Sequence, residues 1–465
     1  MEANENTYIL QEPSPQTASA FTISKQAQNP NVYDTDEDTN RNTSGHNQTS
    51  NLKQTAFNYV NTIIGSGVIG IPYALSRSGF WFGLILLVGI AALTDYSLCI
   101  LIKAGNLAGV STYQDVVEAA YGRWGFYLLT VIQFIYPFIA MISYNVIIGD
   151  SVTKVFRRLL NVSSSSALGN RNSVVFFCTV FIMLPLSLQK NISKLAKVSL
   201  TSVGFIFIII GFIIYRVGTL GPSIPRTSQT FSFINDGVAE AIGVISFAYM
   251  CHHNSFLLYE SLENSTQKRW NRVTHLSVGM SCLIVFVFGV TGYMTFGDLS
   301  QGDLFENYCS SDDLANFARL LFTLTIMLTY PFECFVVRQV LETALWGGKP
   351  PQTTSHHVLL TVAIVFLGFI LSTLTDCLGI VLELNGILAA VPLAFIFPAV
   401  TYLKLDSGHK MSWSKAPAYL LAVFGGLVAI CGSIYVILRV MNGASCSHGI
   451  DMPYCIGNFS ANIAT

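Results

Sequence analysis

Long apolar stretches separated by short polar connections occupy most of the chain. A helix needs about 20 mainly apolar residues to cross the hydrocarbon core of a bilayer. Eleven stretches come near this length, at 54–76, 80–104, 124–157, 173–189, 195–218, 235–259, 273–297, 314–343, 355–376, 378–403 and 415–440. The pattern predicts an all-α, multi-pass membrane protein with eleven transmembrane helices.

The first and the sixth stretch are interrupted in their middle. The first reads FNYVNTIIGSGVIGIPYALS, with Gly65-Ser66-Gly67 at its centre, and the sixth contains Cys251-His252-His253-Asn254. A broken helix is tolerated in a bilayer only where the freed backbone groups face protein or a polar cavity. Because the breaks lie five stretches apart, they predict two inverted halves with a binding site between them. Packing of small residues, such as Ser66 and Gly70, and a packed polar cluster at 251–254 are the alternatives.

The domain organisation follows from these halves. We expect a transporter domain at 53–440, with one repeat at about 54–218, a second at about 235–403, and an extra helix at 415–440. Residues 1–52 are polar and predict a disordered cytosolic tail. Residues 441–465 would form an extracellular or lumenal tail. Between the second and third stretches, Thr112 and Asp115 form a capping pattern that predicts a short surface helix.

Composition and charge support the membrane class and fix an orientation. Hydrophobic residues make up 52% and charged residues 11% of the chain, which excludes a string of soluble domains. The net charge of −1 says nothing about partners, and no basic patch suggests a nucleic-acid partner. Lys and Arg are more frequent in the loops that are cytosolic when the N-terminus is inside. This orientation exposes the sequons at Asn161 and Asn458 to glycosylation.

Most cysteines fall inside the predicted spans, where they are expected to be inert. Cys446 and Cys455 lie outside and close in sequence, so we expect a disulfide between them, with Cys309 as the competing partner.

The ends of the broken first helix predict a binding chemistry. Its second half begins near Gly65, Ser66 and Gly67, where free N–H groups and the helix dipole suit a carboxylate. Its first half ends at Asn61–Ile64, and the exposed carbonyls there suit Na⁺. Thr325 and Thr329 lie one turn apart in the eighth stretch, and their hydroxyls could complete a cation site. The alternative is that they bond back to carbonyls of their own helix.

Polar residues elsewhere in the spans extend the candidate site. His252, His253 and Asn254 are expected to line it, because their break lies five spans after the first. A metal site is not expected there, since adjacent histidines point about 100° apart on a helix. Glu333 and Glu383 are candidates for proton transfer, since a carboxylate at mid-span costs about 2.5–3.5 kcal/mol without a partner. An interhelical hydrogen bond is the alternative. A protonated His253 beside Na⁺ would repel the ion, so we expect acid pH to slow transport.

The stretch VNTIIGSGVIGIPYAL resembles the signature of the sodium-coupled neutral amino acid transporters, in the amino acid/auxin permease group. The resemblance covers about residues 52 to 458. It implies a LeuT-like 5+5 inverted-repeat fold with broken helices one and six. It places Asn61, Ile64 and Thr329 at cation positions, and Gly65, Ser66 and Gly67 at the backbone that holds the amino acid. This chain departs from the family at 251–254, where better-known members carry Cys-His-Pro-Glu, and in the short segment 219–234.

These observations predict a monomeric secondary transporter that moves a neutral amino acid with Na⁺ by alternating access, and not an enzyme. We expect no organic cofactor, and the plasma membrane rather than the lysosome. The alternatives are an H⁺-coupled or organellar exporter and an amino acid sensor that signals through its N-terminal tail.

Overall fold

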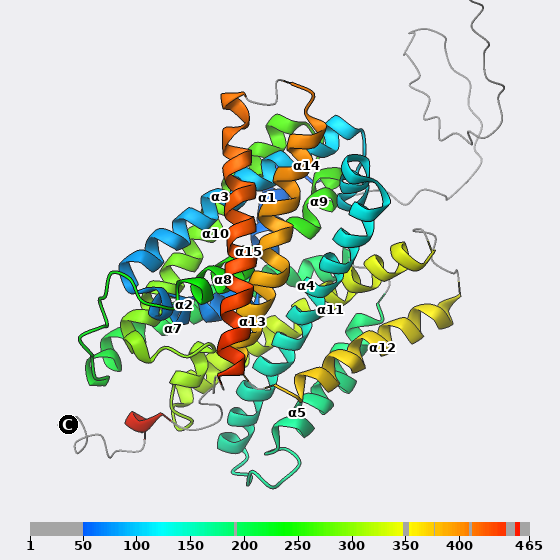
Figure 1. Ribbon diagram of the computed structural model, residues 1–465. Coiled ribbons are helices and arrows are strands. Elements are labelled where there is room, and N and C mark those ends of the chain that lie inside the picture. The colour runs from blue at the N-terminus through cyan, green and yellow to red at the C-terminus, as the bar shows by residue number, and fades with distance from the viewer. Residues whose placement is uncertain are drawn as a thin grey trace, which may run out of the picture. The chain divides into compact units, whose positions relative to one another are not determined.

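The computed structural model describes residues 50–189, 193–346, 353–375, 377–408, 412–442 and 452–455. Within these residues the regular structure is helical, apart from one isolated parallel bridge between Ser50 and Leu262. The all-α prediction is therefore confirmed for this part of the chain (Figure 1). The expected tails at 1–52 and 441–465 fall almost wholly outside it.

The elements are α1 (Leu52–Ile63), η1 (Ser66–Gly70), α2 (Ile71–Ser78), α3 (Phe80–Ala108), α4 (Tyr113–Leu159), α5 (Arg171–Cys178), η2 (Thr179–Met183), α6 (Leu184–Ser187), α7 (Ser193–Thr219), η3 (Gly221–Ser223), α8 (Val238–Ala248), η4 (His252–Asn254), α9 (Ser255–Ser261), α10 (Gln267–Phe296), η5 (Gly297–Leu299), η6 (Leu304–Asn307), α11 (Asp313–Trp346), α12 (Thr354–Ser372), α13 (Leu378–Asn385), η7 (Gly386–Ala390), η8 (Pro392–Ile396), α14 (Phe397–Leu405), η9 (Trp413–Lys415), α15 (Ala416–Met441) and η10 (Pro453–Cys455).

Eight helical segments of the described chain are long and apolar enough to cross a membrane. The first and sixth predicted spans are not among them because each is broken, and the fourth is a shorter apolar helix at Arg171–Ser187. The count of eleven and the inverted repeat stay predictions.

The helix α4 joins the predicted surface helix to the third span. Gly122 lies between them with φ 68°, a left-handed conformation that glycine adopts without steric cost. The Thr112 side chain accepts a hydrogen bond from the backbone N–H of Asp115 at 3.1 Å. The capping prediction is confirmed, and the helix buries Val116 and Val117.

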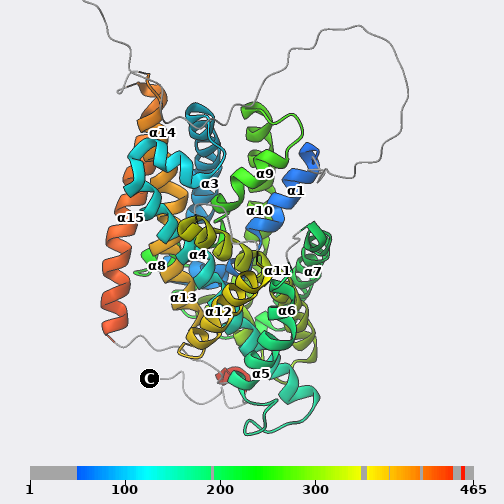
Figure 2. The same cartoon turned by 90° about the vertical axis from the view of Figure 1, so that its right-hand side faces the viewer.

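Packing places the broken helices at the centre of this arrangement. The segment α1–η1–α2 packs against α8 and α10, and α4 runs along α11. Helix α15 lies at the outer edge beside α14 and α8 (Figure 2). Its exposed face carries Leu420, Leu427 and Ile430, as expected for a surface that meets lipid.

The predicted disulfide between Cys446 and Cys455 is wrong. Cys455 is bonded to Cys309, which is 146 residues away in sequence, and Cys446 lies outside the described residues. The physical reason is that the segment around η10 packs on the loop before α11, where the Tyr454 hydroxyl donates to the Asn307 carbonyl at 2.6 Å. Cys377 is disulfide-bonded too.

Candidate functional site

The break in the first span releases the two carbonyls that the sequence singled out. In a continuous helix the Gly65 amide would bond the Asn61 carbonyl, but it donates to Ile63 at 3.0 Å instead. Likewise the Val68 amide donates to the Gly65 carbonyl, at 3.4 Å, rather than to that of Ile64. Both carbonyl oxygens have therefore lost the helical amide that would cover them, and such oxygens are hard ligands for a cation.

Glycine allows the broken segment to lie directly on the sixth span. A Cβ at Gly67 would stand 2.5 Å from the Ala248 Cα, at the C-terminal end of α8. One at Gly70 would stand 3.0 Å from Val244. The two broken helices thus meet at their interruptions. Small-residue packing and a binding site, the two alternatives for Gly65-Ser66-Gly67, are therefore compatible with each other.

Helix α4 brings polar groups to this junction. The Ser66 hydroxyl is hydrogen-bonded to the Ser143 hydroxyl at 3.3 Å, and Ser143 also donates to the Ala140 carbonyl. The Tyr144 hydroxyl lies against Gly65, 3.4 Å from the position of an added Cβ. It is also beside the hydroxyls of Ser66 and Thr329. Tyr144 therefore connects the break to α11.

The predicted threonines lie on α11 and bond back to their own helix. The Thr325 hydroxyl donates to the Leu321 carbonyl at 3.1 Å, and that of Thr329 donates to the Thr325 and Ile326 carbonyls at 3.1 and 3.0 Å. Thr325 is buried, whereas Thr329 keeps some exposed surface. Because Thr329 uses its proton in these bonds, its oxygen lone pairs remain available to a cation.

The break in the sixth span is held by two different neighbours. His252 is fully buried, and its Nε2 is hydrogen-bonded to the Ser97 hydroxyl of α3 at 3.1 Å. His253 is hydrogen-bonded to Asn254 at 3.0 Å and packs on the Tyr136 ring at 5.4 Å. Tyr136 lies two turns of α4 from Ser143, about 10 Å along the helix axis. The segment Cys251-His252-His253-Asn254 is thus near the junction of the two broken helices. The contacts of His252, however, are those of a packing residue.

The two candidate carboxylates lie in different surroundings. Glu333 is one turn beyond Thr329 on α11, near Tyr136 and Tyr144. Its Oε2 is buried and has no hydrogen-bond partner among the described residues. Glu383 instead forms an ion pair with Arg439 of α15 at 2.7 Å. Glu333 therefore faces the candidate site, and Glu383 belongs to a separate charged cluster.

That charged cluster surrounds Glu240, at the start of α8. Glu240 pairs with Arg77 of α2 at 2.8 Å and with Arg439 at 2.7 Å, and it accepts hydrogen bonds from the Tyr73 and Tyr435 hydroxyls. The cluster joins α2, α8, α13 and α15 close to where both broken helices begin or end. It gives the extra helix a polar contact with the site helices.

The sequence reasoning missed Ser143, Tyr144, Tyr136 and Glu240. The only local signal was a few polar residues inside apolar stretches, which does not show what they face. Of the predicted glycosylation sites, Asn161 is exposed in the connection after α4, and Asn458 is outside the described residues.

A loop outside the long helices contains a second group of carboxyls. Asp303 and Glu306, around η6, lie with Asp150 of α4, and one oxygen from each is within 4.8 Å of the others. Lys154 pairs with Glu306 at 2.9 Å and Arg171 with Asp150 at 2.7 Å. Burial, and then repulsion by Glu306, raise the pKa of Asp303 to about 7.

Comparison with known families gives a match over most of the chain. The sequence profile of the family described as "Transmembrane amino acid transporter protein" matches residues 48–438.

Individual relatives agree with this match. The Danio rerio protein named "Putative sodium-coupled neutral amino acid transporter 11" is 44% identical over 421 residues, covering 90% of this chain and 93% of its own. The human protein of that name is 44% identical over 387 residues, covering 83% and 94%. Vacuolar amino acid transporter 2 of Saccharomyces cerevisiae is 30% identical over 415 residues, covering 86% of each chain.

Among solved structures, a mutant of the Eremococcus coleocola manganese transporter is similar in fold. Its TM-score is 0.55 at 14% identity, over 87% of this chain and 91% of that one. At this identity the likeness shows the fold alone.

Proposed function

The chain belongs to the transmembrane amino acid transporter family, and on this premise we propose that it moves a neutral amino acid together with Na⁺ by alternating access. Amino acid transport follows from the family, whose members are transporters and not enzymes. The sodium ion, the neutral class of substrate, a monomeric state and the plasma membrane are our proposals. The proposed transport needs no organic cofactor.

The release of the Asn61 and Ile64 carbonyls, at a break that Tyr144 connects to Thr329, carries this proposal. Two carbonyls and a hydroxyl oxygen are uncharged hard ligands, a set that suits a monovalent cation. The free N–H groups at the start of η1 suit the substrate carboxylate. The close contact of η1 with the end of α8 supports a shared site at the two broken helices, as in transporters that bind substrate at unwound segments.

Uptake by purified protein in proteoliposomes tests the coupling ion. We expect accumulation of a neutral amino acid driven by an inward Na⁺ gradient, and its loss when choline replaces Na⁺. Thr329→Ala should raise the apparent Na⁺ constant roughly tenfold, equal to about 1.4 kcal/mol, because one ligand is removed. Thr291→Ala is the matched control, since Thr291 bonds back to its own helix in the same way but lies on α10. Unchanged uptake in choline would refute Na⁺ coupling.

An H⁺-coupled or organellar transporter is the second candidate. It is favoured by the Glu333 oxygen at the site, which has no hydrogen-bond partner in the described part of the chain, and by the similarity to a vacuolar transporter. Uptake driven by a pH gradient in choline, and lost in Glu333→Gln, would support it. For the Na⁺-coupled transporter we propose that acid pH slows uptake through His253.

A further inference from the structure

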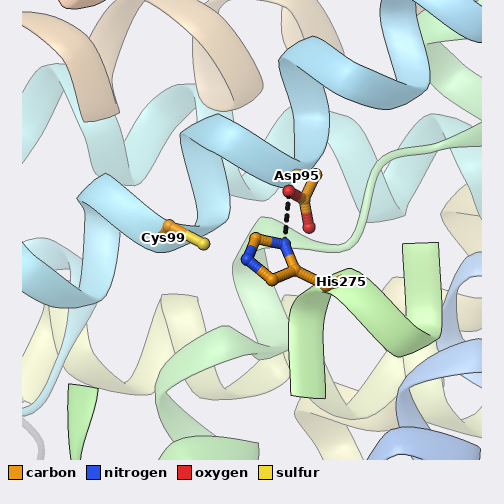
Figure 3. A group of neighbouring side chains, drawn as sticks. All are labelled: Asp95, Cys99 and His275. Atoms are coloured by element: carbon orange, nitrogen blue, oxygen red, sulfur yellow. Dashed lines mark hydrogen bonds and ion pairs between the residues drawn. The ribbon is translucent and has the colours of Figure 1, made fainter. Parts of the chain in front are cut away.

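Two helices outside the candidate site hold a group of three possible metal ligands. Asp95 and Cys99 lie one turn apart on α3 and face His275 of α10 (Figure 3). One ligand atom from each residue lies within 4.8 Å of the other two. The carboxylate Oδ2 of Asp95 is 2.7 Å from the His275 Nδ1.

The donor set is characteristic of one class of cation. A thiolate sulfur, an imidazole nitrogen and a carboxylate oxygen are the three kinds of donor that bind Zn²⁺ in proteins. In a tetrahedral zinc site the donor atoms lie about 3.3–3.8 Å apart, as bond lengths of about 2.0–2.3 Å require. The three donor atoms lie within 4.8 Å of one another, so side-chain rotations would have to bring the most distant of them closer by about 1 Å.

The donor residues are partly exposed on the helix surfaces and incompletely used. The His275 side chain is 59% exposed and that of Asp95 is 23% exposed. The Asp95 Oδ1 is buried and has no hydrogen-bond partner within the described chain. Among the described residues, the hydrogen-bond partner of the Cys99 Sγ is a neutral group, the Thr274 hydroxyl, at 3.2 Å.

The group also lies near the polar end of the helix pair. Gln267, the first residue of α10, donates to the Cys99 carbonyl at 2.9 Å, and Asn106 donates to Gln267 at 3.0 Å. Lys103, one turn beyond Cys99, is the nearest cation on α3, and its ammonium is held by the Tyr402 hydroxyl at 3.0 Å.

We propose that Asp95, Cys99 and His275 form a Zn²⁺ site that clamps α3 to α10. The ion takes the Cys99 thiolate, an imidazole nitrogen of His275 and a carboxylate oxygen of Asp95, and water fills the fourth position. Binding releases the thiol proton to solvent, because the thiolate is the ligand. The Asp95–His275 hydrogen bond is exchanged for coordination.

Cobalt spectroscopy on the purified, metal-stripped full chain in detergent tests the site. Co²⁺ replaces Zn²⁺ and reports a thiolate ligand by a near-ultraviolet charge-transfer band. We expect this band in the wild type, and its loss on addition of Zn²⁺. Cys99→Ser should abolish the band, and His275→Gln should weaken Co²⁺ binding by more than the roughly 10–100-fold that an outer-shell partner costs.

Cys282→Ser is the matched control. Cys282 is another free, half-buried cysteine of α10, and it is in neither group of possible ligands found in the described residues. This variant should keep the band and the affinity. Asp95→Asn preserves the side-chain shape and should weaken binding without unfolding the protein. A wild type without a thiolate band, or a band that survives in Cys99→Ser, overturns the proposal and leaves Asp95 and His275 as a hydrogen-bonded pair only. None of these readouts depends on transport.

Discussion

Asp303 is a carboxyl group outside the long helices, yet it is buried beside Asp150 and Glu306. Its pKa is raised to about 7, first by burial and then by Glu306, although Lys154 and Arg319 oppose the shift. The folded loop therefore keeps a proton that the unfolded loop releases. The stability from this group is fully present below the ordinary carboxyl pKa of about 4, and it is lost as pH rises towards 7.

We expect Asp303→Asn to remove this part of the pH dependence. Between pH 5 and pH 7 the melting temperature of the variant should rise relative to that of the wild type. The reason is that the asparagine side chain at position 303 is uncharged at both pH values. Thermal unfolding of the protein in detergent measures the melting temperature. Asp313→Asn, which alters an exposed carboxylate paired with Arg158, is the control and should not reproduce the trend. Parallel melting curves for Asp303→Asn and wild type would show that Asp303 does not titrate in this range.

His253 carries the second prediction for a single residue. Its neighbours in the described structure are Asn254 and the Tyr136 ring, and its Nδ1 is buried without a partner. An imidazole can gain a charge near physiological pH, and a positive charge beside a bound cation is repulsive. We expect uptake to fall as external pH drops below about 7, and His253→Gln to remove that inhibition. His356→Gln, on the exposed start of α12, should keep it. Wild-type acid inhibition in His253→Gln would make the histidine structural.

At the scale of the elements, the contact between η1 and α8 depends on Gly67. A methyl group there would meet the Ala248 Cα at 2.5 Å, and backbone cannot move aside as a flexible side chain can. Overpacking of this kind costs about 1–3 kcal/mol. We expect Gly67→Ala to lower uptake by at least about tenfold at equal amounts of protein in the membrane. Gly89→Ala, where an added methyl group meets nothing within 4 Å, should transport normally. Normal uptake by Gly67→Ala would mean that the two breaks do not need to touch.

Helix α15 is more than an addition to the two halves, because its Arg439 pairs with Glu240 and Glu383. Both carboxylates are fully buried, while the Arg439 side chain is 23% exposed. Loss of one partner from a buried pair costs about 3–5 kcal/mol, and partial exposure reduces this. We expect Arg439→Gln to lower the melting temperature clearly. Arg158→Gln removes a solvent-exposed pair, which adds little to stability, and should change the melting temperature little. Equal effects of the two variants would refute a structural role for α15.

The sequence predicted the positions of the two helix breaks correctly, but not the residues that contact them. The interruptions at Gly65-Ser66-Gly67 and at 251–254 coincide with η1 and η4, because glycines and polar residues mark a break locally. Ser143, Tyr144 and Glu240 gain their roles from helices far away in sequence, so nothing near them reveals what they contact. The disulfide failed for the same reason, since sequence proximity favoured Cys446 over Cys309.

At the scale of the whole molecule, the described structure places two sequons at opposite ends of the helices. Asn161 follows α4 near α5, and Asn264 lies between α9 and α10; both views show α5 and α9 at opposite ends (Figures 1 and 2). Arg158 at the end of α4 pairs with Asp313 at the start of α11, just after Cys309. Asn161 therefore shares its end of the molecule with the Cys309–Cys455 disulfide.

Only one of these ends can face the compartment where glycans are added and disulfides persist. The disulfide and the predicted orientation both select the end with Asn161. We expect Asn161→Gln to remove a glycan from the protein expressed in eukaryotic cells, seen as a gel shift that glycosidase also removes. Asn264→Gln should leave the shift unchanged. A shift lost with Asn264 instead would invert the orientation and put the Cys309–Cys455 bond in the reducing cytosol. Free thiols at both cysteines would then have to be found by mass mapping, so the two measurements check one another.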